Sequence, residues 1–223
     1  MFLAVAGGAL GTASASAQYA AGVTVATNQI FRGQSVSEDR PAASLALSFD
    51  HSSGAFAGAS LSVGVGGDGP VLDANTQYVG YALRRGETSF ELGAVRRAYR
   101  DLSDRDYARS YVEGFAGVTR GRTSARLFVS PNYYVRDDRL TFYGEVNTTL
   151  ANVEDWSLNG HAGVSLVPGH GVGSGLRAYQ DWKVDASRAV GKFFIAVGVA
   201  GTSYPVVAAN GKPRLFAVVS RAF

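Results

Sequence analysis

The chain ends with Leu215-Phe216-Ala217-Val218-Val219-Ser220-Arg221-Ala222-Phe223, a strand-like segment whose last residue is aromatic. Few soluble folds require such an ending. A bacterial outer-membrane β-barrel does, because its final strand must pair with its first strand to close the barrel. We therefore expect a β-barrel in which Phe223 is the signal read by the barrel-assembly machinery.

The composition of the 223-residue chain agrees with an all-β membrane protein. Hydrophobic residues make up 46% and charged residues 17%, below the roughly 25% charged residues of a soluble domain. No apolar run approaches the ~20 residues of a membrane-spanning helix, which excludes a helical membrane protein. Abundant glycine (28 residues), scarce proline (6) and 12 Phe with 11 Tyr favour strands and tight turns. With no cysteine, disulfides and thiolate metal sites are excluded.

Residues 1–17 have the pattern of a secretory signal peptide. An apolar stretch from Phe2 to Leu10 precedes small residues that end in Ala15-Ser16-Ala17, as at a cleavage site before Gln18. A basic start is missing, so the true start is expected upstream, unless the chain was trimmed. The alternative is a disordered leader rich in Ala and Gly. Residues 18–223 are assigned to one barrel domain.

Alternating apolar and polar or small residues recur in blocks separated by turn-forming residues, as expected of strands. A block of about eleven residues, tilted by about 40°, covers about 28 Å, close to the ~25 Å apolar band of an outer-membrane barrel. Twelve strands are predicted, at 19–31, 42–50, 55–65, 74–84, 88–99, 109–120, 123–135, 140–150, 157–166, 176–184, 189–203 and 213–223.

The predicted connections alternate between short and long. The short ones are 51–54, 85–87, 121–122 and 185–187, and the long ones are 34–41, 66–73, 100–107, 168–175 and 205–212. Because short turns face the periplasm and long loops face outward, both termini are expected in the periplasm.

Two residues fit the predicted strands poorly. Pro131 has no amide donor and falls within the predicted strand 123–135, so a bulge is expected there. Arg221 has the lipid-facing parity of the last strand, but it lies close enough to the periplasmic end to reach the interface.

The two-residue period of a strand separates an outer from an inner face. In the predicted strand 189–203, one face carries the bulky apolar side chains Phe193, Ile195, Val197 and Val199, and the other carries Phe194 with the small residues Ala196, Gly198 and Ala200. Ionisable side chains gather on the inner face, because an Arg or Lys facing lipid at the midplane would cost about 2–4 kcal/mol. The predicted pore lining is Glu91, Arg97, Glu113, Arg126, Glu145, Arg177, Asp181 and Lys183.

These four acids and four bases allow two interpretations. In the first, they are cross-strand ion pairs that fill a narrow barrel. In the second, they line a water-filled constriction that orients solutes and sets the ion preference. We favour the second, because twelve strands enclose more room than the eight that side chains can fill.

Recognisable motifs lie in two early stretches, Val25-Ala26-Thr27-Asn28-Gln29-Ile30-Phe31-Arg32-Gly33-Gln34-Ser35 and, after Pro41, Phe49-Asp50-His51-Ser52-Ser53-Gly54-Ala55-Phe56-Ala57-Gly58. They resemble a strand, an F-R-G-x-S step, an acidic residue before a Pro and a D/H-x-S-G hairpin of the TorF family of bacterial porins. Tyr179-Gln180-Asp181-Trp182 resembles the penultimate hairpin of that family. The resemblance implies an outer-membrane barrel with no catalytic residue, and the solute is not established even for the family.

Three further patterns are weaker. The glycines of 64–69 match a dinucleotide-binding motif by letter, but no helix is expected to follow, so an outer loop is predicted. His161, Ser165 and Asp181 share the inward face, where a hydrolase triad is conceivable, although a hydrogen-bonded histidine is the ordinary explanation and we expect no enzyme. The histidines lack carboxylates at ligand spacing, so we expect no metal site; they are His51, His161 and His170.

We predict passive diffusion of small hydrophilic solutes through an outer-membrane pore. The basic residues are 18 Arg and 3 Lys, and Arg binds carboxylate and phosphate well, so anionic solutes and lipopolysaccharide phosphates are expected partners. The charges form no patch, so nucleic acid is not expected, and neither is a cofactor. The alternatives are a closed structural or adhesin-type barrel, a lipid or ester hydrolase, and a secreted β-sandwich.

Overall fold

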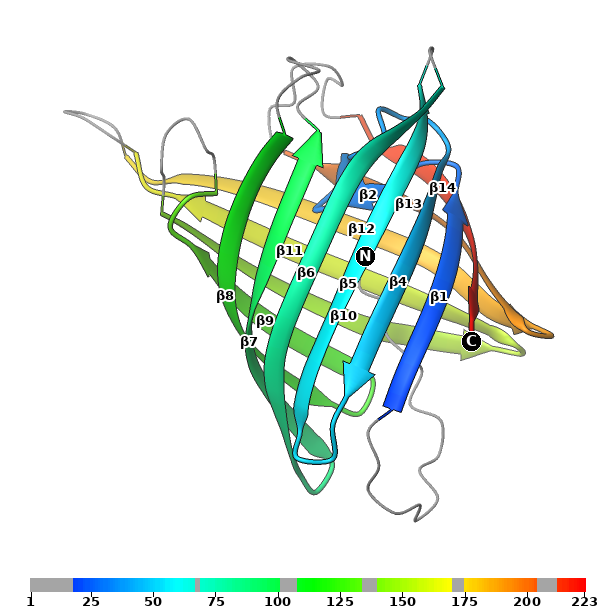
Figure 1. The fold of residues 1–223 in the computed structure, drawn as a ribbon, viewed down its shortest axis with the longest axis horizontal. Helices are drawn as coiled ribbons and strands as arrows, with labels where there is room; N and C mark the ends of the chain where they lie inside the picture. Colours follow the sequence, from blue (N-terminus) through cyan, green and yellow to red (C-terminus); the bar gives the residue numbers. More distant parts are fainter. Residues whose placement is uncertain (1–17, 67–68, 101–107, 134–139, 170–174, 204–211) are drawn as a thin grey trace.

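The structure is a computed structural model that describes residues 18–66, 69–100, 108–133, 140–169, 175–203 and 212–223. These residues form a closed antiparallel barrel of twelve strands with a two-stranded hairpin (Figure 1), which confirms the predicted all-β fold and strand number. The barrel strands are β1 (Gln18–Ala26), β4 (Ala42–Asp50), β5 (Ala55–Gly66), β6 (Gly69–Arg85), β7 (Thr88–Arg100), β8 (Ala108–Arg120), β9 (Thr123–Ser130), β10 (Thr141–Val153), β11 (Trp156–Val167), β12 (Arg177–Val190), β13 (Phe193–Thr202) and β14 (Arg214–Ala222). The hairpin strands are β2 (Ile30–Phe31) and β3 (Gln34–Ser35).

The barrel closes where β14 pairs with β1, as the chain ending predicts. Gly22 lies opposite Ala222, and the Phe223 N–H donates to the Ala21 carbonyl at 2.9 Å. Phe223 thus extends the seam with its backbone, while its role in assembly stays a prediction. We call the end of the barrel that holds Phe223 and the tight turns the turn end, and the opposite end the loop end.

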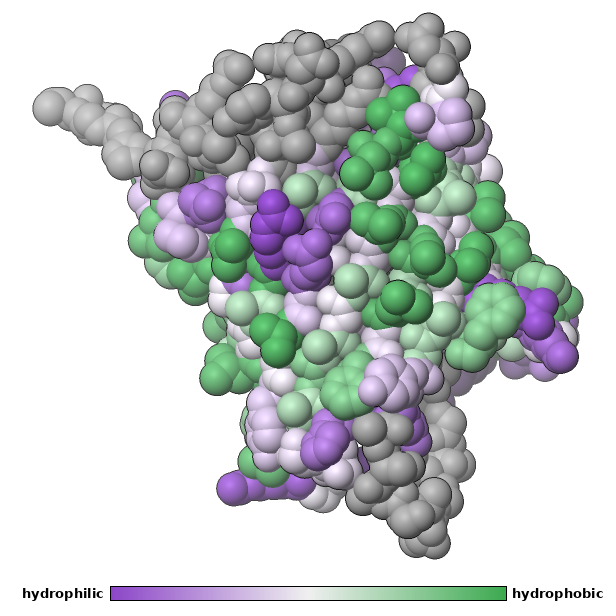
Figure 2. Space-filling model, in the orientation of Figure 1, coloured by the Kyte–Doolittle hydropathy of each residue, from purple (hydrophilic) through white to green (hydrophobic). Residues whose placement is uncertain are grey.

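The predicted faces agree with the burial of the side chains. In β10, Tyr143 is 1% exposed and its neighbour Phe142 is 41% exposed. In β13, Ala196 and Ala200 are buried and Val197 is exposed. Bulky apolar side chains therefore cover much of the outer wall (Figure 2), and small, polar or aromatic ones face the lumen.

The turn predicted at 185–187 is wrong. β12 continues to Val190, and the chain turns at Gly191 and Lys192, where Gly191 has a φ of +60°. Asp185 and Ser187 are buried inside the barrel at 7% and 3% exposure. Their polarity reflects a polar lumen and not a turn.

The bulge predicted at Pro131 is also wrong, because β9 ends at Ser130. The proline lies outside the strand, where no backbone hydrogen bond to a neighbouring strand is needed. Irregular registers occur instead between β10 and β11 and between β5 and β6. At the second of these, the consecutive residues Asp73 and Ala74 are both buried. β6 begins at Gly69, so most of the loop predicted at 66–73 is strand.

Several expectations concern residues outside the described ranges. They are the signal peptide at 1–17 and most of the long connections predicted at 100–107, 168–175 and 205–212. In the glycine motif of 64–69, Gly64 and Gly66 end β5 and Gly69 begins β6. Over the part of the chain that the structure describes, no helix has the length and apolar character needed to cross a membrane.

Candidate functional site

A short hairpin folds from the loop end into the barrel. β1 ends at Ala26, not at residue 31 as predicted, and β2 and β3 pair through Ile30 opposite Ser35 and Phe31 opposite Gln34. Its turn is Arg32-Gly33, with φ angles of 46° and 71°. Figure 1 shows β2 enclosed by the barrel strands. We call residues 28–39 the inward hairpin.

The base of the inward hairpin is tied together by its own side chains. Asn28 donates to Asp39 at 2.7 Å and accepts from the Ser35 hydroxyl at 2.7 Å. Ser37 accepts from the Gln29 N–H at 3.0 Å. Since Asn28 and Ser37 are buried, these bonds hold the hairpin in one shape.

The inward hairpin spans the width of the lumen. Arg214 of β14 donates to Asp39 at 2.7 Å, and Arg32 donates to Glu113 of β8 at 2.8 Å. β14 and β8 lie six strands apart in the ring of twelve, on opposite sides of the barrel. Gln29 also bonds Ser62 of β5. The hairpin is therefore a bridge across the barrel and not a surface loop.

Arg32 is the centre of this bridge. Its guanidinium carbon lies 3.7 Å from the ring centroid of Tyr143 and within 5.3 Å of the rings of Phe31, Phe128 and Tyr133. The side chain is only 5% exposed. Cation–π contacts of this kind are worth most where water is excluded, so the aromatic cage holds the hairpin in the lumen.

Glu113 lies between two arginines. Arg32 binds its Oε1 and Arg97 of β7 binds its Oε2, with all three side chains at most 5% exposed. Two positive charges against one negative charge leave the cluster with a formal charge of +1. The prediction brought Glu113 and Arg97 to the inner face correctly, but it missed Arg32. The feature of the sequence that singles out Arg32 is that it is the first charged residue of the chain and is followed by a glycine.

A second ionic cluster lies nearer the turn end. Arg126 of β9 bonds Glu91 of β7, and its Nη1 lies 3.9 Å from Glu145 of β10. These side chains are 15–25% exposed, so they are less buried than the Glu113 cluster. The sequence predicted only that Arg126, Glu91 and Glu145 face inward, and the structure brings them together into one cross-strand group.

The third cluster lies on β10, β11 and β12. His161 Nε2 lies 2.7 Å from Asp181 and Nδ1 lies 2.8 Å from Asn147, while the Tyr143 hydroxyl donates to Asp181 at 3.2 Å. Both ring nitrogens of His161 thus have a partner other than Ser165. The conceivable Ser/His/Asp arrangement is not assembled, since a serine must bond the histidine to be activated.

Two predicted residues remain. Lys183 pairs with Asp185 at 3.1 Å on the same strand. Arg177 is exposed at the loop end of β12, and the structure brings it to none of the three clusters. Of the predicted lining, six residues thus lie in the three clusters, Lys183 lies in a separate ion pair of the lumen, and Arg177 lies at the rim. Whether they line an open pore stays a prediction.

Gly33 allows a direct test of how tightly the inward hairpin is seated. A Cβ on Gly33 would overlap the Gly201 carbonyl oxygen of β13, whereas a Cβ on Gly86, which has a similar φ, would meet nothing within 4 Å. We expect trypsin to cleave Gly33→Ala after Arg32, because a displaced hairpin exposes this side chain. Wild type and the control Gly86→Ala should resist cleavage there, as read from fragment masses. Equal resistance of all three proteins would show that the contact with β13 does not seat the hairpin.

Comparisons with known proteins bear on this geometry. A family model described as "Bacterial protein of unknown function (Gcw_chp)" matches residues 11–222. The chain belongs to this family. No curated protein sequence matches this Gcw_chp chain.

Solved structures share the fold of this Gcw_chp chain. The KdgM porin has a TM-score of 0.52 at 12% identity, covering 92% of this chain and 99% of that chain. KdgM porin in complex with disordered oligogalacturonate has a TM-score of 0.50 at 12% identity with the same coverage. A membrane protein from a study of in-meso crystallization has a TM-score of 0.53 at 10% identity, covering 92% and 83%. At such low identity, the likeness concerns the fold alone.

Proposed function

We propose that the chain is an outer-membrane, porin-like channel for small hydrophilic solutes, and that the inward hairpin forms its narrowest part. The observation that carries the proposal is a hairpin fixed across an ionic lumen, inside a closed barrel whose outer wall is apolar. A wall of this polarity suits a membrane. The KdgM-like fold and the resemblance to TorF porins support the proposal. The turn end, with both termini, then faces the periplasm.

An anion preference is proposed to arise at the level of the inward hairpin. The Glu113 cluster has a formal charge of +1 there, and fixed charge at a constriction selects ions of opposite sign. Nearer the turn end, the described lumen is richer in acids. An anion preference therefore requires that the positive charge at the level of the inward hairpin outweighs these acids. That a KdgM porin was solved with oligogalacturonate supports acidic sugars as candidate solutes.

A second candidate is a closed barrel with a structural or adhesin role. It is favoured by the same hairpin, because a bridge with an aromatic cage can also seal the lumen. Recording from single molecules in a planar bilayer distinguishes the two. A pore gives discrete current steps with a reversal potential displaced toward anions, and a sealed barrel gives no steps.

Arg126 should influence ion selectivity. We expect Arg126→Glu to shift the reversal potential toward cations, because the change replaces the one base between Glu91 and Glu145 with a third acid. Lys192→Glu makes the same change of charge in the turn after β12, outside the lumen, and should shift the potential less. Reversal potentials that do not differ between Arg126→Glu and wild type would place Arg126 outside the ion path.

A further inference from the structure

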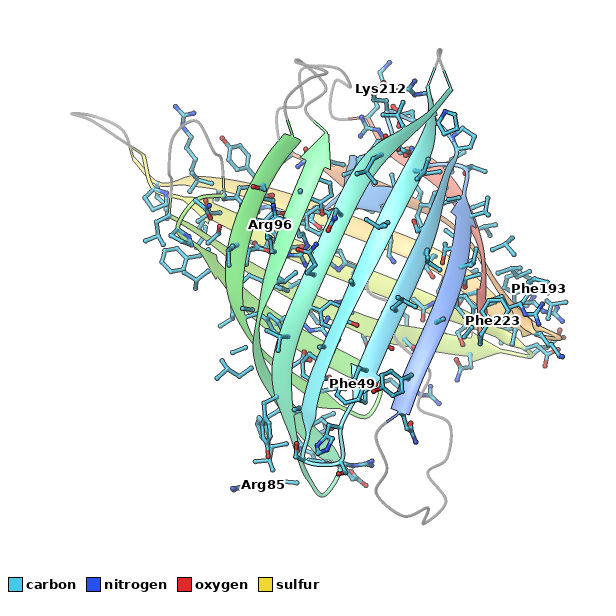
Figure 3. The ribbon with its side chains drawn as sticks, in the orientation of Figure 1. Phe49, Arg85, Arg96, Phe193, Lys212 and Phe223 are labelled. Carbon is cyan, nitrogen blue, oxygen red and sulfur yellow. The ribbon has the colours of Figure 1, made fainter. Side chains whose placement is uncertain are left out.

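Three polar side chains interrupt the apolar outer wall. Arg96 of β7 donates to Gln77 of β6 at 3.3 Å, and Gln77 donates to Asn75 at 2.6 Å. Arg96 and Gln77 are partners in the β6–β7 register. Figure 2 shows a hydrophilic patch on this face, and Figure 3 labels Arg96 within it. We call these three residues the outer-wall ladder.

The outer-wall ladder is surrounded by side chains suited to lipid. Val79 and Leu92 toward the turn end are 59% and 67% exposed, and Val112 beside Arg96 is 43% exposed. The other arginines with described side chains and outward parity lie within three residues of a turn or the chain end, namely Arg85, Arg120, Arg188 and Arg221. Arg96 alone among them lies well along a strand.

The height of Arg96 on the barrel places its guanidinium near the outer interface. It lies eight residues beyond Thr88, the first residue of β7, or about 20 Å above the turn for a strand tilted by about 40°. The apolar band is about 25 Å tall, and an arginine side chain extends toward the interface to reach polar groups. In the orientation of the proposed function, on which this step rests, that interface is the outer one.

The charge of the outer-wall ladder decides between its possible occupants. Acids with described side chains face the lumen or lie in the hairpin and the turns, as Asp155 does. The described part of this wall on a second copy would therefore bring no carboxylate to Arg96. A lipid phosphate would supply the missing anion, and arginine binds phosphate through several parallel donors. Gly114, two residues from Val112, leaves open space for the rest of a lipid, since a Cβ there would meet nothing within 4 Å.

We propose that Asn75, Gln77 and Arg96 form a site on the outer wall for the phosphate of a membrane lipid in the outer leaflet. Arg96 supplies the positive charge. Gln77 holds the guanidinium on one side, and Asn75 holds Gln77 in turn. Lipid is thereby bound outside the barrel, away from the lumen clusters.

Native mass spectrometry of the detergent-purified full chain tests the site, with lipid A as the probe and the same glycolipid without phosphates as its comparison. We expect wild type to retain lipid A, and Arg96→Leu to retain it roughly tenfold more weakly, as for the loss of a charge-assisted hydrogen bond. The matched control is Arg120→Leu, an exposed outward arginine at the turn end, which should bind like wild type. If Arg96→Leu fails to fold, Gln77→Leu should show a smaller loss in the same direction.

Four results would overturn the proposal. They are equal retention of lipid A by Arg96→Leu and wild type, equal binding of the glycolipid without phosphates, binding of inorganic phosphate as tight as that of lipid A, and a wild-type dimer that binds no lipid and dissociates in Arg96→Leu. The last result would assign the ladder to a second copy. The binding assay does not depend on ion conduction. A chain that carries no current could therefore still bind lipid A at this site, and the two proposals can fail separately. Arg96→Leu should conduct like wild type.

Discussion

Removal of the inward hairpin is expected to raise the single-channel conductance several-fold. Replacing residues 28–39 by a short Gly-Ser linker deletes the bridge between β14 and β8 and removes Arg32 from the lumen. A twelve-stranded barrel is wider than the eight-stranded barrels that side chains alone fill, so water should then occupy the freed space. The measurement is the step size in planar bilayers at fixed salt.

A matched control for this deletion replaces the turn 51–54 with the same linker chemistry. That turn lies at the turn end, away from the hairpin, and its replacement should leave the step size unchanged. If the deletion variant and this control conducted equally, the hairpin would not be the narrowest part of the path.

Truncation of Glu113 is expected to have the largest effect on stability. Glu113→Ala leaves Arg32 and Arg97 facing each other with no acid between them. Removing one partner of a buried ion pair typically costs about 3–5 kcal/mol, and here two cations lose the same partner. We expect a loss of this order in the free energy of unfolding, measured by urea titration of the folded barrel in lipid vesicles.

Glu91→Ala is the comparison for that experiment. Glu91 and Arg126 are 19% and 25% exposed, so solvent can screen the arginine that remains, and the expected loss is smaller. Similar losses for the two variants would show that the Glu113 cluster is as hydrated as the Glu91 cluster. The variant with Arg32 and Glu113 both replaced by Met should recover part of the stability lost in Glu113→Ala.

The wall of the barrel could be predicted from the sequence because it depends on local regularities. Outside the irregular registers of β5–β6 and β10–β11, a period of two residues separates lumen from lipid. For this reason the faces of β10 and β13 were predicted correctly even though the limits of β13 were not. The turn at 185–187 was wrong for a related reason. A polar lumen places Asp and Ser inside a strand, where they look like turn residues when only the composition of a short segment is considered.

The inward hairpin could not be predicted, because its contacts are not local. Phe31 keeps the parity of the apolar residues Val23 and Val25 of β1, so the segment reads as one longer strand. What turns it inward is the pairing of Arg32 with Glu113, 81 residues away, and of Asp39 with Arg214, 175 residues away. Neither pairing leaves a pattern in the sequence of a single chain. Most charges of the wall were found, but Asp185 was predicted as a turn residue, and Arg32, which crosses the lumen to the wall, was missed.

The most direct test of the central claim is single-channel recording from the intact, folded chain in a planar bilayer, beside the variant without residues 28–39. We predict small discrete current steps for the intact chain and larger ones for the variant. Correct folding is checked by a shift in gel migration on heating. A folded barrel that inserts and carries no current in either form would contradict a pore narrowed by the inward hairpin.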